Sequence, residues 1–288
     1  MTRHLVRRWT YPAVAGGTLL YLGHVLSQAG APPAWQHGAF IVVLVAVLLS
    51  LEVLWPLDRR WGMTRALLVR RDMPYLLINA ATIATANAAA AWLIWHHGLT
   101  PPITWLRDLP VVPAAALTLL VTDGLWYAVH RASHEGRGWL GAWLWRVHMA
   151  HHLPQQVYVV MHVVGHPINA VIVRLLLTVP PWLLGVSPEA LYVANVVTAV
   201  QGLVSHFNVD SRAGWFNHLL VGTELHRWHH AVGVQGNYAA VLSVWDRLFG
   251  TLVYRPGENP GHLGVDDPDH LPRDTDWRRV LWAPLRRQ

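Results

Sequence analysis

Three short clusters of histidines lie between residues 130 and 230. Each cluster spaces its imidazoles three or four residues apart: His130 and His134; His148, His151 and His152; and His226, His229 and His230. Residues at these spacings share one face of an α-helix, so each cluster is predicted to direct its ring nitrogens toward one point. Histidines are concentrated in this region, because 12 of the 19 lie between residues 130 and 230. The pattern indicates metal binding.

The type and number of the candidate ligands restrict which metals can bind. The chain has no cysteine, so a metal must be held by imidazole and oxygen. Imidazole-rich sites suit iron, zinc, copper or nickel, whereas magnesium and calcium prefer oxygen ligands. Eight imidazoles exceed what one zinc ion binds, which favours two metals side by side. We expect His206 and His166 to supply further ligands because each stands at one end of a predicted helix, and His162 is a weaker candidate.

Two carboxylates lie close to the clusters in the sequence. Asp123 precedes His130 by seven residues, two helical turns earlier, inside an otherwise apolar stretch. We predict that it accepts the second ring N–H of a metal-binding histidine, the alternative being an ion pair with Arg131 or Arg146. Glu224, two residues before His226, is predicted either to hold a histidine in the same way or to stabilise a helix N-terminus.

Several other metal chemistries can be weighed at this point. His134 and Glu135 begin like the HExxH motif of zinc proteases, but Gly138 stands where the second histidine is required. A helix bundle that holds haem with two imidazoles would not need eight ligands. Two classes stay open: a membrane hydrolase or isomerase with a dinuclear zinc site, and a metal-carrying membrane protein without turnover.

The elements that position these residues are predicted to be membrane helices. Only 13% of the residues are charged and 53% are hydrophobic, against about 25% charged residues in soluble proteins. Apolar stretches of about 20 residues are long enough to span a bilayer. They predict an all-α, polytopic membrane bundle of about 4–6 spans with a cytoplasmic, histidine-rich helical cap. The candidate spans are residues 11–29, 38–57, 75–96, 110–130, 167–185 and 188–205.

The placement of arginine predicts the orientation. All 22 basic residues are arginine; three of them precede the first span and five lie in the 58–74 loop. The positive-inside rule then places both termini and the metal site in the cytoplasm. Topology and anionic lipid explain the basic charge, so no nucleic-acid partner is expected. A cleavable signal peptide is disfavoured because a second apolar stretch follows the first.

The polar tail, residues 255–288, follows the last span and differs from the rest of the chain. Its residues 277–282 combine tryptophan and arginine, which suits a short helix lying on the membrane surface. The alternative is a tail that folds back on the domain.

The histidine clusters lie within a series of motifs between residues 120 and 252. These motifs are, in order, Asp123-Gly124-Leu125-Trp126-Tyr127-Ala128-Val129-His130-Arg131, Leu144-Trp145-Arg146-Val147-His148, His166-Pro167, His206-Phe207-Asn208, Glu224-Leu225-His226-Arg227-Trp228-His229-His230, Asn237-Tyr238 and Trp245-Asp246-Arg247-Leu248-Phe249-Gly250-Thr251. Their order and spacing resemble those of the fatty acid hydroxylase/sterol desaturase superfamily of membrane diiron oxygenases. This resemblance implies that the eight clustered histidines, with His206 and His166, are iron ligands.

The resemblance also implies an activity and its partners. A single membrane oxygenase domain, residues 1–288 with its core at about 120–252, would use two iron ions and O₂ to hydroxylate or desaturate a C–H bond of a lipid. Zinc is a substitute metal, and the lipid is a sterol, fatty acyl, carotenoid or ether lipid. The only His-Pro pair continues as Ile168-Asn169, unlike a cytochrome b5. Electrons are therefore expected from a separate ferredoxin or cytochrome b5-like donor and its reductase.

Two positions depart from the superfamily's pattern. Val164 stands where an arginine is common, and Ala239 where a glycine often follows Asn-Tyr. Neither change removes a ligand. Because Val164 lies within residues 154–166, the substrate properties of the superfamily are carried over least to this region.

Overall fold

The computed structural model describes residues 2–28 and 32–285, and the regular elements within these ranges are all helices. Apart from them, two isolated bridges pair Pro56 with Val209 and Ala231 with Leu263. The longer helices are α1 (Thr2–Leu26), α2 (Ala34–Leu54), α4 (Met73–His96), α5 (Val111–Glu135), α6 (Gly138–His152), α7 (Pro167–Leu183) and α8 (Pro188–Ser205). The shorter ones are α3 (Arg65–Leu67), α9 (Thr223–His229), α10 (Val244–Leu248) and α11 (Trp277–Trp282). The predicted all-α class is confirmed.

Three helical segments of the described chain are long and apolar enough to cross a membrane: Trp35–Leu54, Arg59–His96 and Val111–Glu135. The apolar helix α7 is shorter. Large apolar side chains such as Val53 on α2 and Leu77 on α4 are exposed, as expected of helices in contact with lipid. The helices α1 and α8 occupy two further predicted ranges, but the number of spans stays a prediction.

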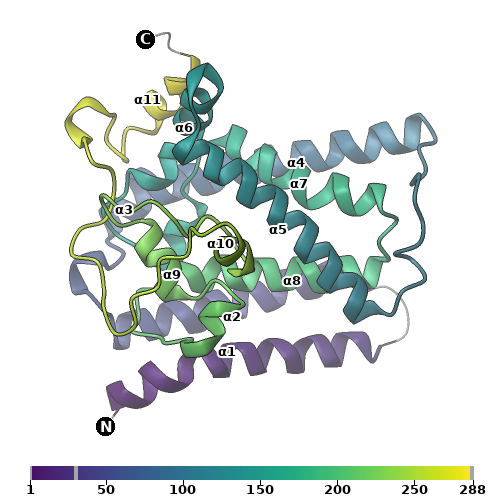
Figure 1. The fold of residues 1–288 in the computed structure, drawn as a ribbon, viewed down its shortest axis with the longest axis horizontal. Helices are drawn as coiled ribbons and strands as arrows, with labels where there is room; N and C mark the ends of the chain where they lie inside the picture. The colour runs from purple at the N-terminus through teal and green to yellow at the C-terminus, as the bar shows by residue number, and fades with distance from the viewer. Residues whose placement is uncertain (1, 29–31, 286–288) are drawn as a thin grey trace.

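The long helices place their ends at two opposite poles of the bundle (Figure 1). The connections from α4 to α5 and from α7 to α8 lie at one pole, on the right of Figure 1. The short helix α9 lies toward the other pole, and the ring of its His229 contacts that of His134 near the end of α5, with ring centroids 4.8 Å apart. The helix α5 crosses the bundle diagonally and packs against α6, α7 and α8. The end of α5 is therefore brought next to α9.

Local sequence signals fix where the central helices begin. Pro188 is the first residue of α8, and the Ser187 hydroxyl accepts a hydrogen bond from the Ala190 N–H. Proline at the first position and serine before it are favoured because helix N-termini leave backbone N–H groups unpaired. The helix α7 likewise begins at Pro167, preceded by His166. These starts set the axial position of both helices.

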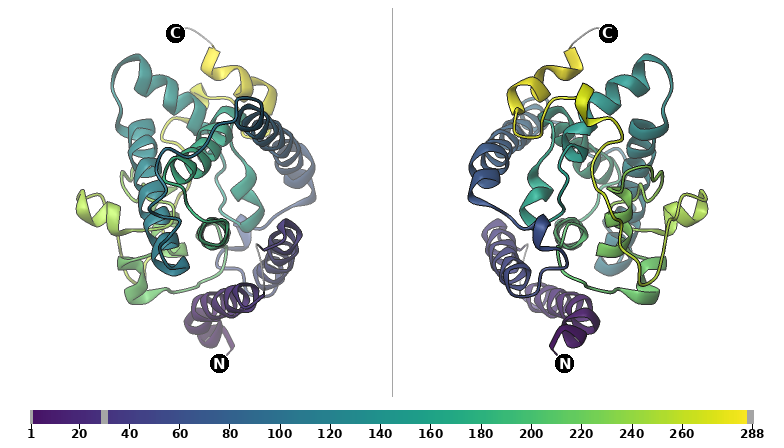
Figure 2. Two further views of the ribbon diagram at one scale, coloured as in Figure 1. Left: turned by 90° about the vertical axis from the view of Figure 1, so that its right-hand side faces the viewer. Right: turned by 90° about the vertical axis from the view of Figure 1, so that its left-hand side faces the viewer.

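The C-terminal tail folds back on the bundle. Val280 of α11 is buried with Tyr75 and Tyr158, and the tail lies beside α4 and α6 in both views of Figure 2. The fully buried Arg71 guanidinium forms ion pairs with Asp72 and Asp274. The structure therefore supports the folded-back tail.

Candidate metal centre

Nine histidines meet in two neighbouring groups at the pole where α5 ends. The first group has five members: His130, His134, His148, His152 and His229. The second has four members: His151, His206, His226 and His230. Within each group, one ring nitrogen of every member lies within 4.8 Å of those of the others. The eight clustered histidines and His206 are thus brought together.

Histidines from one helix belong to different groups, contrary to the prediction that each cluster converges on one point. The cluster on α6 is divided, with His148 and His152 in the first group and His151 in the second. The cluster at α9 is divided in the same way: His229 belongs to the first group, and His226 and His230 belong to the second. Residues one apart differ by about 100° around a helix, so neighbouring histidines face different groups. The prediction that each cluster converges on one point is therefore wrong for two of the three clusters.

Main-chain carbonyls fix the orientation and tautomer of four rings. The Nδ1–H groups of His130 and His151 donate to the carbonyls of Tyr238 (2.6 Å) and Val164 (2.9 Å). Those of His206 and His229 donate in the same way, to the carbonyls of Gly202 (2.8 Å) and Gly236 (2.9 Å). A carbonyl can only accept a hydrogen bond, so the proton is on Nδ1 and the lone pair on Nε2. All four rings therefore present a metal-binding nitrogen.

The contacts between these nitrogens fit a bound cation. The Nε2 atoms of His151 and His206 lie 3.0 Å apart, although the carbonyls leave a lone pair on each. Two such lone pairs repel each other unless a cation lies beside both of them. In the first group, His134 Nε2 is buried without a hydrogen-bond partner among the described residues. Both groups thus have the donor chemistry of a metal site.

Burial keeps the histidine rings of both groups neutral. Loss of hydration lowers the pKa of His148, His152, His226 and His230 well below the ordinary value. It lowers the pKa of His229 to about 4. Neutral imidazole is the form that binds metals, so the site is in its binding state at neutral pH.

Asp123 is buried close to the site, but it does not hold a histidine. Its carboxylate accepts hydrogen bonds from the backbone N–H groups of Ala240 (3.0 Å), Val241 (3.0 Å) and Leu242 (2.8 Å). The predicted contact with a ligand ring, and the alternative ion pair with an arginine, are both replaced by this backbone clamp. The clamped segment follows Tyr238, whose carbonyl orients His130. Asp123 therefore acts on the site through the backbone.

Asp246 holds the same backbone segment as Asp123 does, a role that the sequence analysis did not predict. Its carboxylate accepts the backbone N–H groups of Tyr238 (2.8 Å) and Ala239 (3.0 Å) and the Thr251 hydroxyl (2.7 Å). Together, two carboxylates hold five consecutive N–H groups, from residue 238 to residue 242. The carbonyl that orients His130 is therefore fixed from both sides.

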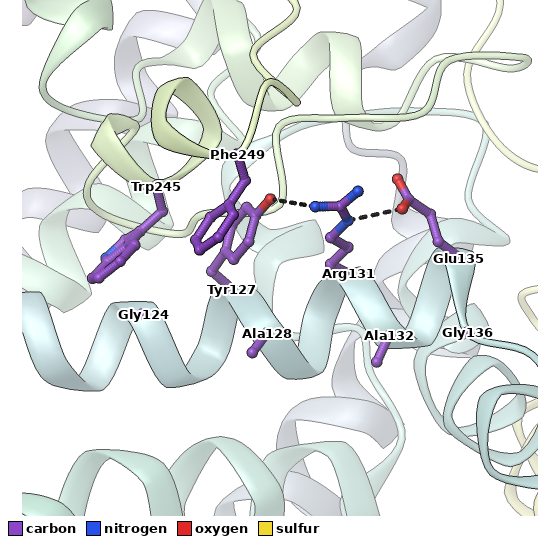
Figure 3. Close-up of a pocket in the computed structure, with 9 residues that line it drawn as sticks. All are labelled: Gly124, Tyr127, Ala128, Arg131, Ala132, Glu135, Gly136, Trp245 and Phe249. Atoms are coloured by element: carbon purple, nitrogen blue, oxygen red, sulfur yellow. Dashed lines mark hydrogen bonds and ion pairs between the residues drawn. The ribbon is translucent and has the colours of Figure 1, made fainter.

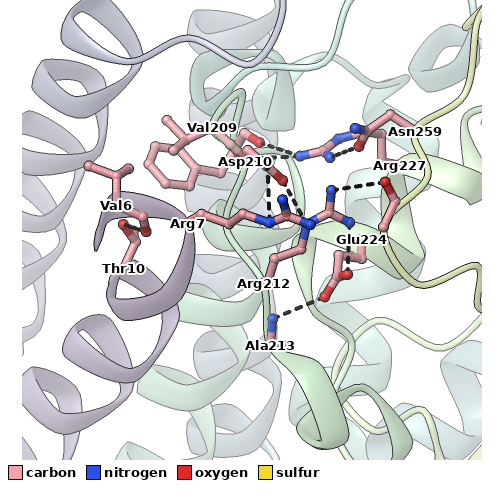
Figure 4. Close-up of polar contacts among 12 residues, drawn as sticks. Val6, Arg7, Thr10, Val209, Asp210, Arg212, Ala213, Glu224, Arg227 and Asn259 are labelled. Atoms are coloured by element: carbon pink, nitrogen blue, oxygen red, sulfur yellow. Dashed lines mark hydrogen bonds and ion pairs between the residues drawn. The ribbon is translucent and has the colours of Figure 1, made fainter. Parts of the chain in front are cut away.

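Glu224 does not hold a histidine, but it lies in the first turn of α9, as the second of its two predicted roles requires (Figure 4). It accepts hydrogen bonds from the Arg212 guanidinium (3.0 Å), the Ala213 N–H (3.0 Å) and the Asn217 amide (2.6 Å), not from a histidine. Arg212 and Arg7 of α1 both form ion pairs with Asp210. The network ties the start of α9 to the 210–217 segment and to α1.

His166 lies outside both groups. Its Nδ1 accepts the Ile168 N–H at 3.0 Å, and its Nε2–H donates to the Leu281 carbonyl at 3.1 Å. Both nitrogens are therefore used, one to begin α7 and the other to hold the tail. The expectation that His166 completes the ligand set does not agree with this placement. His162 is outside the groups as well, with its ring centroid 4.9 Å from that of His206.

Glu52 is a further positioning residue that the sequence analysis missed. It lies on α2, is buried, and accepts the backbone N–H groups of Val159 (2.9 Å) and Asn208 (2.8 Å). It thereby joins the turn that carries His162 to the segment that follows His206. The available signal was that Glu52 is the only acidic residue between positions 1 and 57.

Two clefts lie near the site. The first, of about 460 Å³, lies between the end of α5, the start of α6 and the 231–235 and 264–266 segments, and it reaches His134, His152 and His229. The second, of about 480 Å³, lies along another face of α5 and is lined by Tyr127, the Arg131–Glu135 ion pair and Phe249 (Figure 3). Its lining includes none of the nine histidines. The first cleft is therefore the one that gives access to the metal-binding groups.

A helical bundle with apolar, membrane-length helices and a buried cluster of imidazoles defines a class: membrane-associated proteins with a polyhistidine metal site. Comparison with known proteins narrows it. The fatty acid hydroxylase family model matches residues 115–251, which confirms the predicted resemblance to the fatty acid hydroxylase/sterol desaturase superfamily. No solved structure matches the chain.

The relatives that the chain matches include proteins named as lipid or sterol hydroxylases and monooxygenases. An ornithine lipid hydroxylase, OlsE of Rhizobium tropici, is 29% identical over 236 residues, which are 77% of this chain and 68% of that protein. A putative methylsterol monooxygenase of Dictyostelium discoideum is 28% identical over 50% of this chain and 54% of that protein. A cholesterol 25-hydroxylase-like protein of Danio rerio is 26% identical over 54% and 63%. These relatives support an oxygenase.

Proposed function

We propose that the chain hydroxylates a membrane lipid with O₂ at a dinuclear iron centre held by the nine histidines. The observation that carries the proposal is the pair of facing lone pairs on His151 and His206, 3.0 Å apart, beside a second group of five imidazoles. Two irons, when bound, supply the activation of O₂. One oxygen atom enters the C–H bond, and the other leaves as water with two electrons and two protons from a separate donor.

The geometry of the groups supports two metals rather than one. His152 of the first group and His230 of the second stack with their ring centroids 4.5 Å apart, so the groups share a wall. Nine imidazoles exceed the coordination of a single ion. The same donor set would accept zinc in place of iron. The hydroxylases and monooxygenases among the relatives favour the oxygenase over a dinuclear zinc hydrolase or isomerase.

The chain's own groups prepare the site. Four backbone carbonyls keep the lone pairs of their histidines directed inward. Asp123 and Asp246 hold the segment that carries one of these carbonyls. The Trp126 indole stacks on His130, with ring centroids 4.9 Å apart, and Trp145 lines the cleft that reaches His134. These apolar walls limit the entry of water, which would otherwise compete in the reaction.

The substrate we propose is an acyl lipid of the ornithine-lipid kind. The relative that acts on ornithine lipid aligns with 77% of this chain, whereas the methylsterol relative aligns with 50%. Asp266 is the one carboxylate among the described residues that line the first cleft, and it suits a lipid headgroup that carries an ammonium. A neutral Asp266→Asn variant would then raise KM more than it lowers kcat for a cationic lipid.

We further propose that the protein is a multi-pass membrane protein, a single domain with its site and both termini in the cytoplasm. Three apolar helices of membrane length support the spans. The arginines of residues 59–71 support the orientation. Because the natural chain has no cysteine, a single cysteine introduced at Glu258 reports its own side of the membrane. A membrane-impermeant maleimide is expected to label it only after the membrane is opened.

Labelled oxygen tests the function. Purified protein in nanodiscs, with iron, a ferredoxin and its reductase, would be given ornithine lipid under ¹⁸O₂. We expect a lipid product heavier by one ¹⁸O atom, and no product from the His151→Ala variant. A product without ¹⁸O, or turnover in the absence of O₂ and reductant, would contradict the proposal and favour a hydrolase or isomerase.

A further inference from the structure

The two groups of histidines have the same design except at one position. The first consists of two pairs spaced by four residues on a helix, plus a single histidine: His130 with His134, His148 with His152, and His229 alone. The second has one such pair and two single histidines: His226 with His230, then His151 and His206. A residue four positions before His206 would complete the match, and that residue is Gly202.

The imidazole of His162 takes the space of the side chain that Gly202 lacks. A Cβ atom on Gly202 would lie 2.7 Å from Cε1 and 2.9 Å from Nε2 of His162. Positions 202 and 206 share one face of α8, because residues four apart are neighbours on a helix. The ring of His162 therefore lies beside His206 where a helix partner of His206 would place its own side chain.

The distances agree with membership of the second group. The ring centroids of His162 and His206 are 4.9 Å apart, the same separation as between His151 and His206. His162 belongs to the 3₁₀ turn Val159–Val163. The Glu52 carboxylate fixes the start of this turn relative to Asn208, just beyond α8. The turn is thus built into the end of the bundle.

The His162 ring is free to bind. Within the described residues, no hydrogen bond occupies either nitrogen of its ring. This contrasts with His166, four residues later, which uses both of its nitrogens in hydrogen bonds.

We propose that His162 is the fifth imidazole of the second metal, supplied by the 159–163 turn in place of a residue at position 202. The ring nitrogens lie outside the 4.8 Å that unites the other four members, so binding requires a rotation of the His162 side chain. Each metal then has five imidazoles. The inference rests on the proposed dinuclear centre and adds a ligand to it.

Metal retention tests the inference. Full-length protein loaded with ⁵⁷Fe would be dialysed against a chelator, and iron per chain and the Mössbauer spectrum measured. The wild type is expected to keep two irons. His162→Phe, which keeps an aromatic ring against Gly202, is expected to bind the second iron at least ~10-fold more weakly and to keep about one. His166→Phe is the matched control and is expected to keep both.

Moving the imidazole provides the sharper experiment. In the double variant His162→Ala/Gly202→His, the new side chain stands one helical turn before His206, and the second iron is expected to return. Two irons and an unchanged spectrum in His162→Phe would overturn the inference. A folded double variant that holds only the first iron would overturn it as well. A wild type that never holds two irons would instead contradict the proposed dinuclear centre.

Discussion

The clamp at Asp123 offers a test of how the fold orients a metal ligand. In Asp123→Asn, the amide oxygen can still accept the N–H groups of Ala240 and Val241. The amide nitrogen, however, replaces the oxygen that accepts the Leu242 N–H at 2.8 Å. One buried donor is left facing another donor. The carbonyl of Tyr238, which orients His130, then loses part of its support.

The size of the effect follows from the bonds that are lost. A buried donor without a partner costs about 1–3 kcal/mol. Asp123→Ala leaves all three N–H groups without their acceptor, so we expect it to cost roughly twice as much or more. A loss of about 1 kcal/mol lowers the melting temperature of a domain of this size by roughly 2–4 °C. Both variants should therefore melt earlier, the alanine variant more so.

Thermal unfolding in nanodiscs, combined with iron analysis, measures both consequences. The order of stability is expected to be wild type, then Asp123→Asn, then Asp123→Ala, with iron content falling in the same order. Glu258→Gln removes an exposed carboxylate in the tail and should match the wild type. If Asp123→Ala melts and binds iron as the wild type does, the backbone clamp does not support the site and the reasoning is refuted.

Three further predictions concern the ligands, pH and the tail. His151→Ala should lose iron and activity, whereas His166→Ala should keep both irons and lose only stability. Equal iron loss in the two variants would contradict the assignment of His151 as a metal ligand and His166 as a structural residue. The pKa of His229 is about 4 in the fold and 6.5 in the unfolded chain, so the unfolded chain binds the proton first. The metal-free protein should keep its full stability above pH 6.5 and lose on the order of 3 kcal/mol from this residue as the pH falls to 4; a melting temperature independent of pH across this window would contradict it. Arg71→Ala leaves Asp72 and Asp274 without their buried partner and should cost about 3–5 kcal/mol, with the tail becoming sensitive to protease; a tail as resistant as in the wild type would show that the ion pairs do not hold it.

Helical spacing made much of the metal centre predictable. The distances of three and four residues within each cluster are set by the helix itself, so the eight clustered histidines could be identified as candidate ligands without knowing the fold. His206 followed from its place at the end of a predicted helix. The same geometry, applied fully, also separates His151 from His152, because neighbouring residues on a helix point about 100° apart.

The wrong expectations came from treating proximity in sequence as contact. Seven residues on a helix extend about 10 Å, too far for Asp123 to reach a ring near His130. Glu224, two residues before His226, lies on nearly the opposite side of α9. His166 precedes a proline at a helix start, a signal for capping that competes with metal binding. The tail could not be placed at all, because Arg71 and Asp274 are 203 residues apart in the sequence.

The central claim is that the nine histidines assemble a dinuclear centre. The most direct measurement is the metal content of the full-length protein, purified without added chelator and loaded anaerobically with iron, together with its Mössbauer spectrum. We predict two irons per chain, coupled to each other and bound by nitrogen. A folded protein that saturates at one iron, or two irons without magnetic coupling, would contradict the account.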